Sequence, residues 1–133
     1  MAVTRFGVSL ESAVLKKLDT IVKNEQFPNR SRALAFLVNQ YKINKQWQSN
    51  ANVSGAIMLV YDHHKRDLLN QLTSIQHDFR HLILSSQHVH LDHHNCLETI
   101  TIKGKAKELL ALSDQLKAVK GISHGDIIMS SNQ

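Results

Sequence analysis

The chain has 133 residues, of which 42% are hydrophobic, and a formal net charge of +5. This length permits one domain or two small ones, and the apolar content predicts a folded chain. A single cysteine excludes an internal disulfide and fits a reducing compartment. Residues 1–20 do not look like a signal peptide and no apolar run approaches a membrane span, so we expect a cytoplasmic protein without a membrane partner.

Charge and histidine are unevenly distributed along the chain. Residues 1–50 carry eight Lys/Arg against three Asp/Glu, whereas residues 51–133 carry eight of each and all nine histidines. The division indicates an anionic partner for the first part and a metal ion for the second. The alternative for the positive charge is an ordinary solvated surface.

The first part of the chain reads as one strand and two helices. Residues 4–10 alternate strictly between apolar and polar and predict a half-buried strand. Apolar residues recur at helical spacing over 14–22, and a second helix follows the turn at 27–31 and runs to about residue 45. A lone strand leaves its backbone groups unpaired, so we expect two chains to pair as an antiparallel ribbon.

Arg5, Gly7 and Ser9 would project from one face of that ribbon. A two-stranded ribbon fits the DNA major groove, where an arginine can bond bidentately to guanine. The R-F-x-V-S-L strand and the N-R-S turn before the second helix resemble the ribbon-helix-helix DNA-binding family. The resemblance implies that Arg5, Gly7 and Ser9 lie over the bases of double-stranded operator DNA. Gly7 departs from the family, whose members usually present a polar side chain there.

The same resemblance implies phosphate contacts at the N-terminus of the second helix. The residues concerned are Asn29, Arg30 and Ser31.

The second part of the chain predicts a different arrangement. A polar stretch without periodicity at 46–54 indicates a linker. Beyond it, the patterns predict strands at 55–61, 82–91, 96–103 and 122–130, and helices over the 68–79 stripe and from about residue 105. The order βαββαβ is the ferredoxin-like arrangement, so we expect an α+β protein. The expected domains are 1–48 for DNA binding and dimerisation, 49–54 as linker, and 55–133 for metal binding.

Four of the nine histidines and the only cysteine lie within residues 87–98. On a strand, His88 and His90 point to one face about 7 Å apart, close enough to bind one ion. A turn through 92–95 would bring Cys96 beside them. Two imidazoles and a thiolate suit a late first-row divalent ion such as Ni, Cu or Zn. The set is one ligand short of a four-coordinate site.

His77 is the candidate for the missing ligand. It lies about 200° around its helix from Ile75, on the side away from the core of its own chain. It would reach the strand histidines of a second chain more easily than its own. We interpret His63 and His93 as alternative ligands for Zn or Cu or as exposed side chains. The remaining four histidines, expected at the surface or in polar networks, are His64, His81, His94 and His124.

Three motifs resemble the nickel-responsive transcriptional regulators: Y-D-H-H-K-R-D at 61–67, I-Q-H at 75–77 and H-x-H-x5-C-L-E at 88–98. The resemblance covers nearly the whole chain. It implies a homotetramer in which ribbon-helix-helix dimers flank a core of ACT-like domains. It also implies one Ni(II) per subunit in a square-planar site, which Cu(II) would also favour. The ligands would be His88, His90 and Cys96 of one subunit and His77 of a neighbouring subunit.

Further roles follow from this resemblance. Lys65 and Arg66 would touch the DNA backbone once metal is bound. Glu98, one strand period beyond Cys96, would fix the tautomer of an imidazole ligand. Some family members build an additional metal site between the domains. Arg32 and Phe36 occupy the matching positions here, so we do not expect that site.

The leading hypothesis is a nickel-dependent regulator that binds Ni(II), then operator DNA, and represses nickel-uptake genes. Four protein ligands leave no open position for a substrate, so we do not expect an enzyme. The alternatives are a metal-buffering protein, a regulator of another metal such as Cu, Zn or Co, and an ACT-type amino-acid sensor.

Overall fold

The computed structural model describes residues 2–132, and the chain divides between residues 41 and 42 into two compact units. The N-terminal unit contains α1 (Ser12–Asn24) and the beginning of α2 (Arg30–Gln48), as the helical spacing predicted. The amphipathic face of α1 buries Leu18. The side chain of Asn29 accepts a hydrogen bond from the backbone N–H of Arg32 at 2.9 Å and so caps α2.

The predicted strand at 4–10 is not formed in this structure, where residues 2–11 have no regular secondary structure. Its apolar residues are exposed, with Phe6 at 77% and Val8 at 61%. The physical reason is that the described chain offers no second strand to pair with this segment, and an isolated strand leaves its backbone groups to water. The segment and the two helices line an apolar groove of about 970 Å³ within the N-terminal unit.

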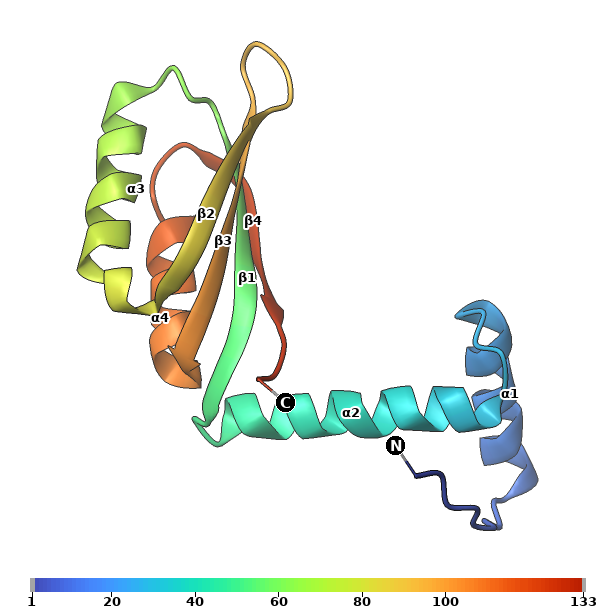
Figure 1. Cartoon of the computed structure of the whole chain (residues 1–133). Coiled ribbons are helices and arrows are strands. Elements are labelled where there is room, and N and C mark those ends of the chain that lie inside the picture. The colour runs from blue at the N-terminus through green and yellow to red at the C-terminus, as the bar shows by residue number, and fades with distance from the viewer. Residues whose placement is uncertain (1, 133) are drawn as a thin grey trace. The chain divides into compact units, whose positions relative to one another are not determined.

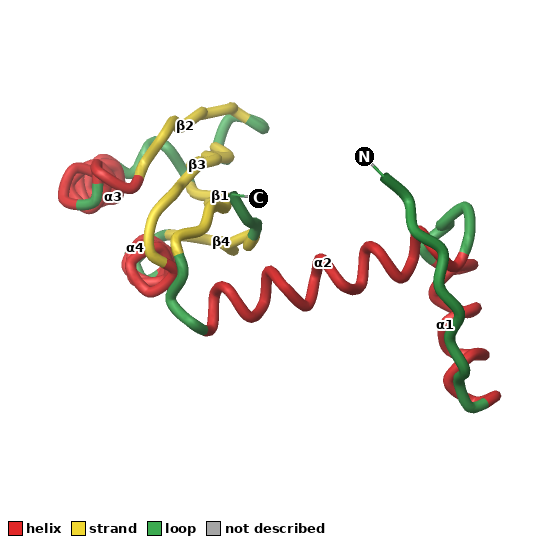
Figure 2. Tube along the Cα trace, turned by 60° about the horizontal axis from the view of Figure 1, so that its bottom comes forward, coloured by secondary structure: helices red, strands yellow, loops and turns green. Residues whose placement is uncertain are grey.

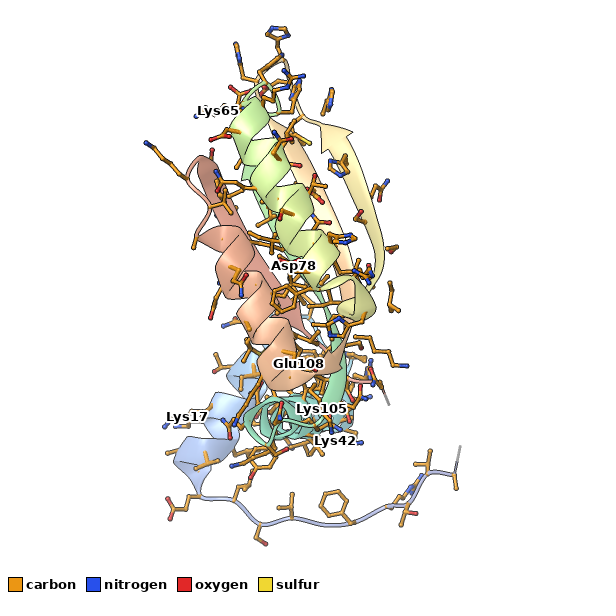
Figure 3. All side chains as sticks on the ribbon, turned by 90° about the vertical axis from the view of Figure 1, so that its left-hand side faces the viewer. Lys17, Lys42, Lys65, Asp78, Lys105 and Glu108 are labelled. Carbon is orange, nitrogen blue, oxygen red and sulfur yellow. The ribbon has the colours of Figure 1, made fainter. Side chains whose placement is uncertain are left out.

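The C-terminal unit is a four-stranded antiparallel sheet in the order β2-β3-β1-β4. Helices α3 and α4 cover the same face of this sheet (Figures 1 and 2), and they lie side by side in Figure 3. The chain order is βαββαβ, as predicted. The elements are β1 (Asn52–Tyr61), α3 (Arg66–Asp78), a short 3₁₀ turn (Arg80–Leu82), β2 (Ile83–His90), β3 (Cys96–Lys105), α4 (Ala106–Lys117) and β4 (Ile122–Met129).

The core lies between the sheet and the two helices. Alternate residues of β1 and β3 face the helices and are fully buried, including Ile57, Leu59 and Ile100. They pack against a leucine stripe of α4 that contains Leu109 and Leu112. Each such side chain contributes about 1.5–3 kcal/mol when fully buried. The core therefore holds β1 and β3 in register, and this register positions the residues described below.

The boundaries of α2, β1 and β3 differ from the sequence prediction. Helix α2 continues to Gln48 and β1 already begins at Asn52, so the stretch expected as a linker is shorter. Trp47 stabilises this longer helix because its buried indole donates a hydrogen bond to the carbonyl of Ser130 at 2.9 Å. Strand β3 does not end before Gly104 but continues through it to Lys105, where it still pairs with β1. None of the described helices combines the length and apolar character needed to cross a membrane.

Candidate metal centre

The register between β2 and β3 places the main candidate ligands on one face of the sheet. His88 stands opposite Glu98, and His90 stands opposite Cys96. Directly opposed residues of antiparallel strands project to the same face, with Cβ atoms about 4.5–5.5 Å apart. Cys96 and Glu98 belong to the alternation of β3 that faces the helices and are each 1% exposed. The two histidines lie on β2, at the edge of the sheet, and stay exposed.

A tight turn joins these two strands, as predicted. The backbone N–H groups of Leu91 and Asp92 donate to the carbonyl of Asn95 at 2.8 and 3.4 Å. The carboxylate of Asp92 accepts hydrogen bonds from the backbone N–H groups of His94 and Asn95. It also accepts from the side-chain amide of Asn95, and these bonds lower the pKa of Asp92. The turn brings Cys96 back beside His90.

Glu98 is the centre of a buried hydrogen-bond network. Its two carboxylate oxygens accept from the hydroxyl of Tyr61 at 2.7 Å and from the amide of Gln76 at 2.8 Å. The imidazole of His88 lies 3.5 Å from the same carboxylate through Nε2 and 3.3 Å from the Tyr61 hydroxyl through Nδ1. Burial, followed by the carboxylate of Glu98, raises the pKa of Tyr61, so the phenol remains a hydrogen-bond donor. Glu98 and Tyr61 thereby orient the ring of His88.

His77 is exposed, as its helical phase predicted, yet it lines the same groove as His88 and Glu98. This groove has a volume of about 410 Å³. Nη1 of Arg80 lies 3.2 Å from Nε2 of His77. Within residues 2–132, no three of the four expected ligands bring their donor atoms within 4.8 Å of one another. The ring of His90 instead stacks on the ring of His63, with 4.2 Å between the ring centroids. The single described chain therefore does not bring three of these four ligands together.

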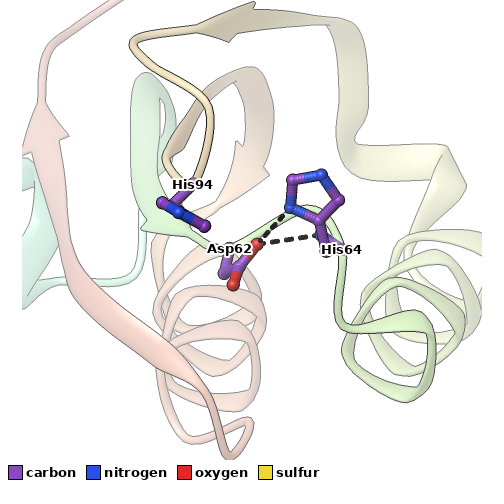
Figure 4. Close-up of side chains that lie close together, drawn as sticks. All are labelled: Asp62, His64 and His94. Atoms are coloured by element: carbon purple, nitrogen blue, oxygen red, sulfur yellow. Dashed lines mark hydrogen bonds and ion pairs between the residues drawn. The ribbon is translucent and has the colours of Figure 1, made fainter.

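A different cluster does meet that distance criterion. Donor atoms of Asp62, His64 and His94 lie within 4.8 Å of one another (Figure 4). The sequence pattern assigned both histidines to the surface, and they are exposed. Their proximity was not apparent in the sequence, because it depends on two loops meeting at one end of the sheet. The only sequence feature that could have indicated this cluster is the presence of two adjacent histidine pairs, at 63–64 and 93–94.

The residues expected at DNA are all accessible. Arg5, Gly7 and Ser9 lie in the exposed N-terminal segment. Arg30 forms an ion pair with Asp19 of α1, with N–O distances of 2.8 and 3.0 Å. The hydrogen bonds from Arg30 lower the pKa of Asp19.

The remaining candidates lie at two helix starts. Ser31 follows the cap Asn29 and is exposed in the first turn of α2. Lys65 and Arg66 are exposed where α3 begins, and Figure 3 labels Lys65 at that end of the helix.

At the two positions where the family resemblance leads us to look for carboxylates of an additional metal site, the side chains offer no acidic ligand. Arg32 is exposed, and Phe36 packs its ring against Phe27 at 5.4 Å between centroids.

The fold of the C-terminal unit resembles that of two solved structures. The ACT domain of GTP pyrophosphokinase of Chlorobium tepidum aligns over its whole length with 59% of this chain, at a TM-score of 0.50 and 20% identity. An uncharacterized protein from Thermotoga maritima aligns over 96% of its length with 59% of this chain, at a TM-score of 0.54 and 15% identity. At these identities the similarity concerns the fold alone: the C-terminal unit has a fold like that of an ACT domain.

Sequence comparison then identifies the family. Residues 54–130 match the family described as the NikR C-terminal nickel-binding domain. A protein of Syntrophus aciditrophicus, provisionally named a nickel-responsive regulator, is 47% identical over 128 residues, covering 96% of this chain and 93% of that protein. One from Chlorobaculum tepidum with the same provisional name is 48% identical over 127 residues, covering 96% and 95%. The chain belongs to the family of nickel-responsive transcriptional regulators, which are not enzymes.

Proposed function

We propose that this chain is a cytoplasmic, nickel-dependent regulator that binds Ni(II) and then double-stranded operator DNA, repressing genes for nickel uptake. The observation that carries the proposal is the strand register of the C-terminal unit. In a chain of this family, it aligns two imidazoles, a thiol and a carboxylate on one face of β2 and β3.

The donor set fits nickel. Imidazole nitrogen and thiolate sulfur are ligands that a late first-row divalent ion prefers over Mg²⁺ or Ca²⁺. His88, His90 and Cys96 would hold the ion, with His77 of a neighbouring subunit as the fourth ligand and one ion per subunit. Within residues 2–132 no three of these four side chains meet, which is consistent with a site completed by a second subunit. A bound ion would link two subunits of a homotetramer.

The chain's own residues would prepare that site. Glu98 is buried and held by Tyr61 and Gln76, so its carboxylate has a fixed position beside His88. Such a partner fixes the tautomer and orientation of an imidazole ligand. The ring of His90 would leave its stack on His63 to join Cys96 across the strand pair.

The N-terminal unit supports the DNA-binding half of the proposal. The exposed apolar residues at Phe6, Val8 and Leu10 form one face of an unpaired segment. Pairing of two such segments as an antiparallel ribbon would cover this face and satisfy the backbone groups. Arg5, Gly7 and Ser9 would then lie over the bases.

Phosphate contacts would come from other parts of the surface. The residues proposed for them are Asn29, Arg30, Ser31, Lys65 and Arg66.

Fluorescence anisotropy on DNA from a nickel-uptake promoter tests the proposal, with and without Ni(II). We expect nickel to tighten DNA binding by about 5- to 150-fold, the usual size of such coupling. His88→Ala should abolish the nickel effect, whereas the control His124→Ala, at an exposed site on β4, should retain it. Equal DNA affinity with and without nickel in the unsubstituted protein would refute the proposal.

Two further variants separate the halves of the function. Cys96→Ser should remove the thiolate-to-nickel absorption band of the nickel-loaded protein, because that band requires the sulfur ligand. Arg5→Ala should weaken DNA binding and leave nickel binding unchanged. A metal-buffering protein would instead show no DNA binding for Arg5→Ala to weaken.

A further inference from the structure

We propose that Asp62, His64 and His94 form a second site for a late first-row divalent cation, separate from the set that contains Cys96. We call these three residues the Asp62 cluster. The proposal does not require nickel at Cys96, since it rests on different donor atoms.

Strand pairing creates the cluster. Tyr61, the last residue of β1, pairs with Cys96, the first residue of β3. The loop that leaves β1 and the turn that enters β3 are therefore neighbours at one end of the sheet. Asp62 and His64 lie on that loop, and His94 lies on the turn. Figure 4 shows the three side chains gathered from these two segments.

Backbone hydrogen bonds order both segments. The carboxylate of Asp62 accepts from the backbone N–H of His64 at 3.0 Å. The carboxylate of Asp92 accepts from the backbone N–H of His94 at 2.8 Å, and Asn95 tightens the same turn. Each histidine is thus anchored by an aspartate two residues earlier. Little backbone entropy remains to be lost when an ion binds.

The distances suit a metal ion. Two cis ligands at about 2.1 Å from one ion lie about 3.0 Å apart at 90°, and about 3.4 Å apart in a tetrahedron. Oδ1 of Asp62 and Nδ1 of His64 are 3.0 Å apart. The third donor, from His94, lies within 4.8 Å of both and belongs to an exposed ring. The Asp62–His64 pair therefore fits two ligands of one ion at 90°, and an exposed site leaves positions for water.

The surroundings supply an independent observation. Nδ1 of His63 is shielded from solvent and has no hydrogen-bond partner among the described residues. The ring centroid of His63 lies 4.1 Å from that of His64. The ring centroid of His93 lies 5.0 Å from that of His64 and 4.8 Å from that of His94. Buried ring nitrogens normally have a partner. His63 therefore places a further imidazole beside the Asp62 cluster, while its ring also stacks on His90 of the Cys96 set.

The chemistry defines the ligand class. Two imidazoles and one carboxylate suit Zn(II), Co(II), Ni(II) or Cu(II), whereas Mg²⁺ and Ca²⁺ prefer oxygen alone. The cluster has no thiolate and is exposed to water. We therefore expect weaker binding and faster exchange than at the Cys96 set.

Equilibrium dialysis of the full chain against Ni(II), and separately Co(II), tests the proposal by counting bound ions. We expect two ions per subunit at saturation in the unsubstituted protein and one in the double variant His64→Ala/His94→Ala. The matched control is His81→Ala/His124→Ala, which removes two exposed histidines outside the cluster and should still bind two. Asp62→Asn should weaken the second ion by at least about tenfold, the lower limit for partners of a metal site.

Cys96→Ser separates this proposal from the proposed function. It should lose the thiolate absorption band and still bind the second ion, whose nitrogen and oxygen ligands produce no such band. If the proposed nickel function fails, the number of ions bound by the two double variants still tests the cluster. If His64→Ala/His94→Ala and His81→Ala/His124→Ala bind the same number of ions with the same affinities, the cluster histidines are ordinary surface residues and the proposal is overturned. Circular dichroism checks that each variant is folded.

Discussion

The buried pair of Tyr61 and Glu98 allows a quantitative prediction for Tyr61→Phe. The substitution keeps the ring in the core and removes only the hydroxyl, which donates to the carboxylate at 2.7 Å. Hydrogen bonds to charged groups contribute about 1.5–3 kcal/mol. The carboxylate oxygen is buried with Glu98, so water cannot readily replace the lost donor. We expect a loss of about 2 kcal/mol, or roughly 30-fold in the unfolding equilibrium.

Urea unfolding followed by tryptophan fluorescence measures this loss. Trp47 is the only tryptophan, and it is buried in the C-terminal unit, so its emission reports the unit that contains Tyr61. Protein concentration is held constant, because assembly adds to apparent stability. The control is Ser85→Ala, which removes an exposed hydroxyl on β2 of the same unit, where a change within about 0.5 kcal/mol is expected. Equal losses for the two variants would refute the role of the buried pair.

Three more predictions follow from the same structure. The pKa of Tyr61 is raised in the folded protein, so above pH about 10 the phenol ionises more readily in the unfolded chain and the free energy of unfolding should fall. Urea midpoints measured against pH should show this fall, and the fall should be smaller in Tyr61→Phe. The folded pKa of Asp19 is lowered by Arg30, so this pair's contribution should disappear as pH falls below about 4; helical circular dichroism of Arg30→Ala should lack that step. Gly121 has φ +105°, so Gly121→Ala should cost about 1–3 kcal/mol, measured as a lower Tm; an unchanged Tm would contradict this backbone strain.

Much of the fold was predictable because periodicity is a property of neighbouring residues. The apolar run at 55–61 and the leucine spacing of α4 are two of the patterns that predicted the βαββαβ order. The pair His88 and His90 was assigned to one strand face for the same reason. Element ends were less predictable: Trp47 extends α2 through a hydrogen bond to Ser130, a residue distant in the sequence.

The N-terminal segment marks a different limit. Its alternating pattern is that of a strand, yet the described chain leaves Phe6 and Val8 exposed and the segment unpaired. A strand requires a partner for its backbone groups. The pattern therefore expresses a preference that a single chain cannot satisfy.

The sequence alone determined which side chains carry nitrogen, sulfur or carboxylate donor atoms, and its periodicity predicted which face of a strand or helix they occupy. Only the tertiary structure decided which of them meet. The pairing of Tyr61 with Cys96 brings Asp62 and His94 together, and the burial of Glu98 places its carboxylate beside His88. These contacts depend on strand register and core packing between distant segments, and local sequence patterns contain no information about such distances.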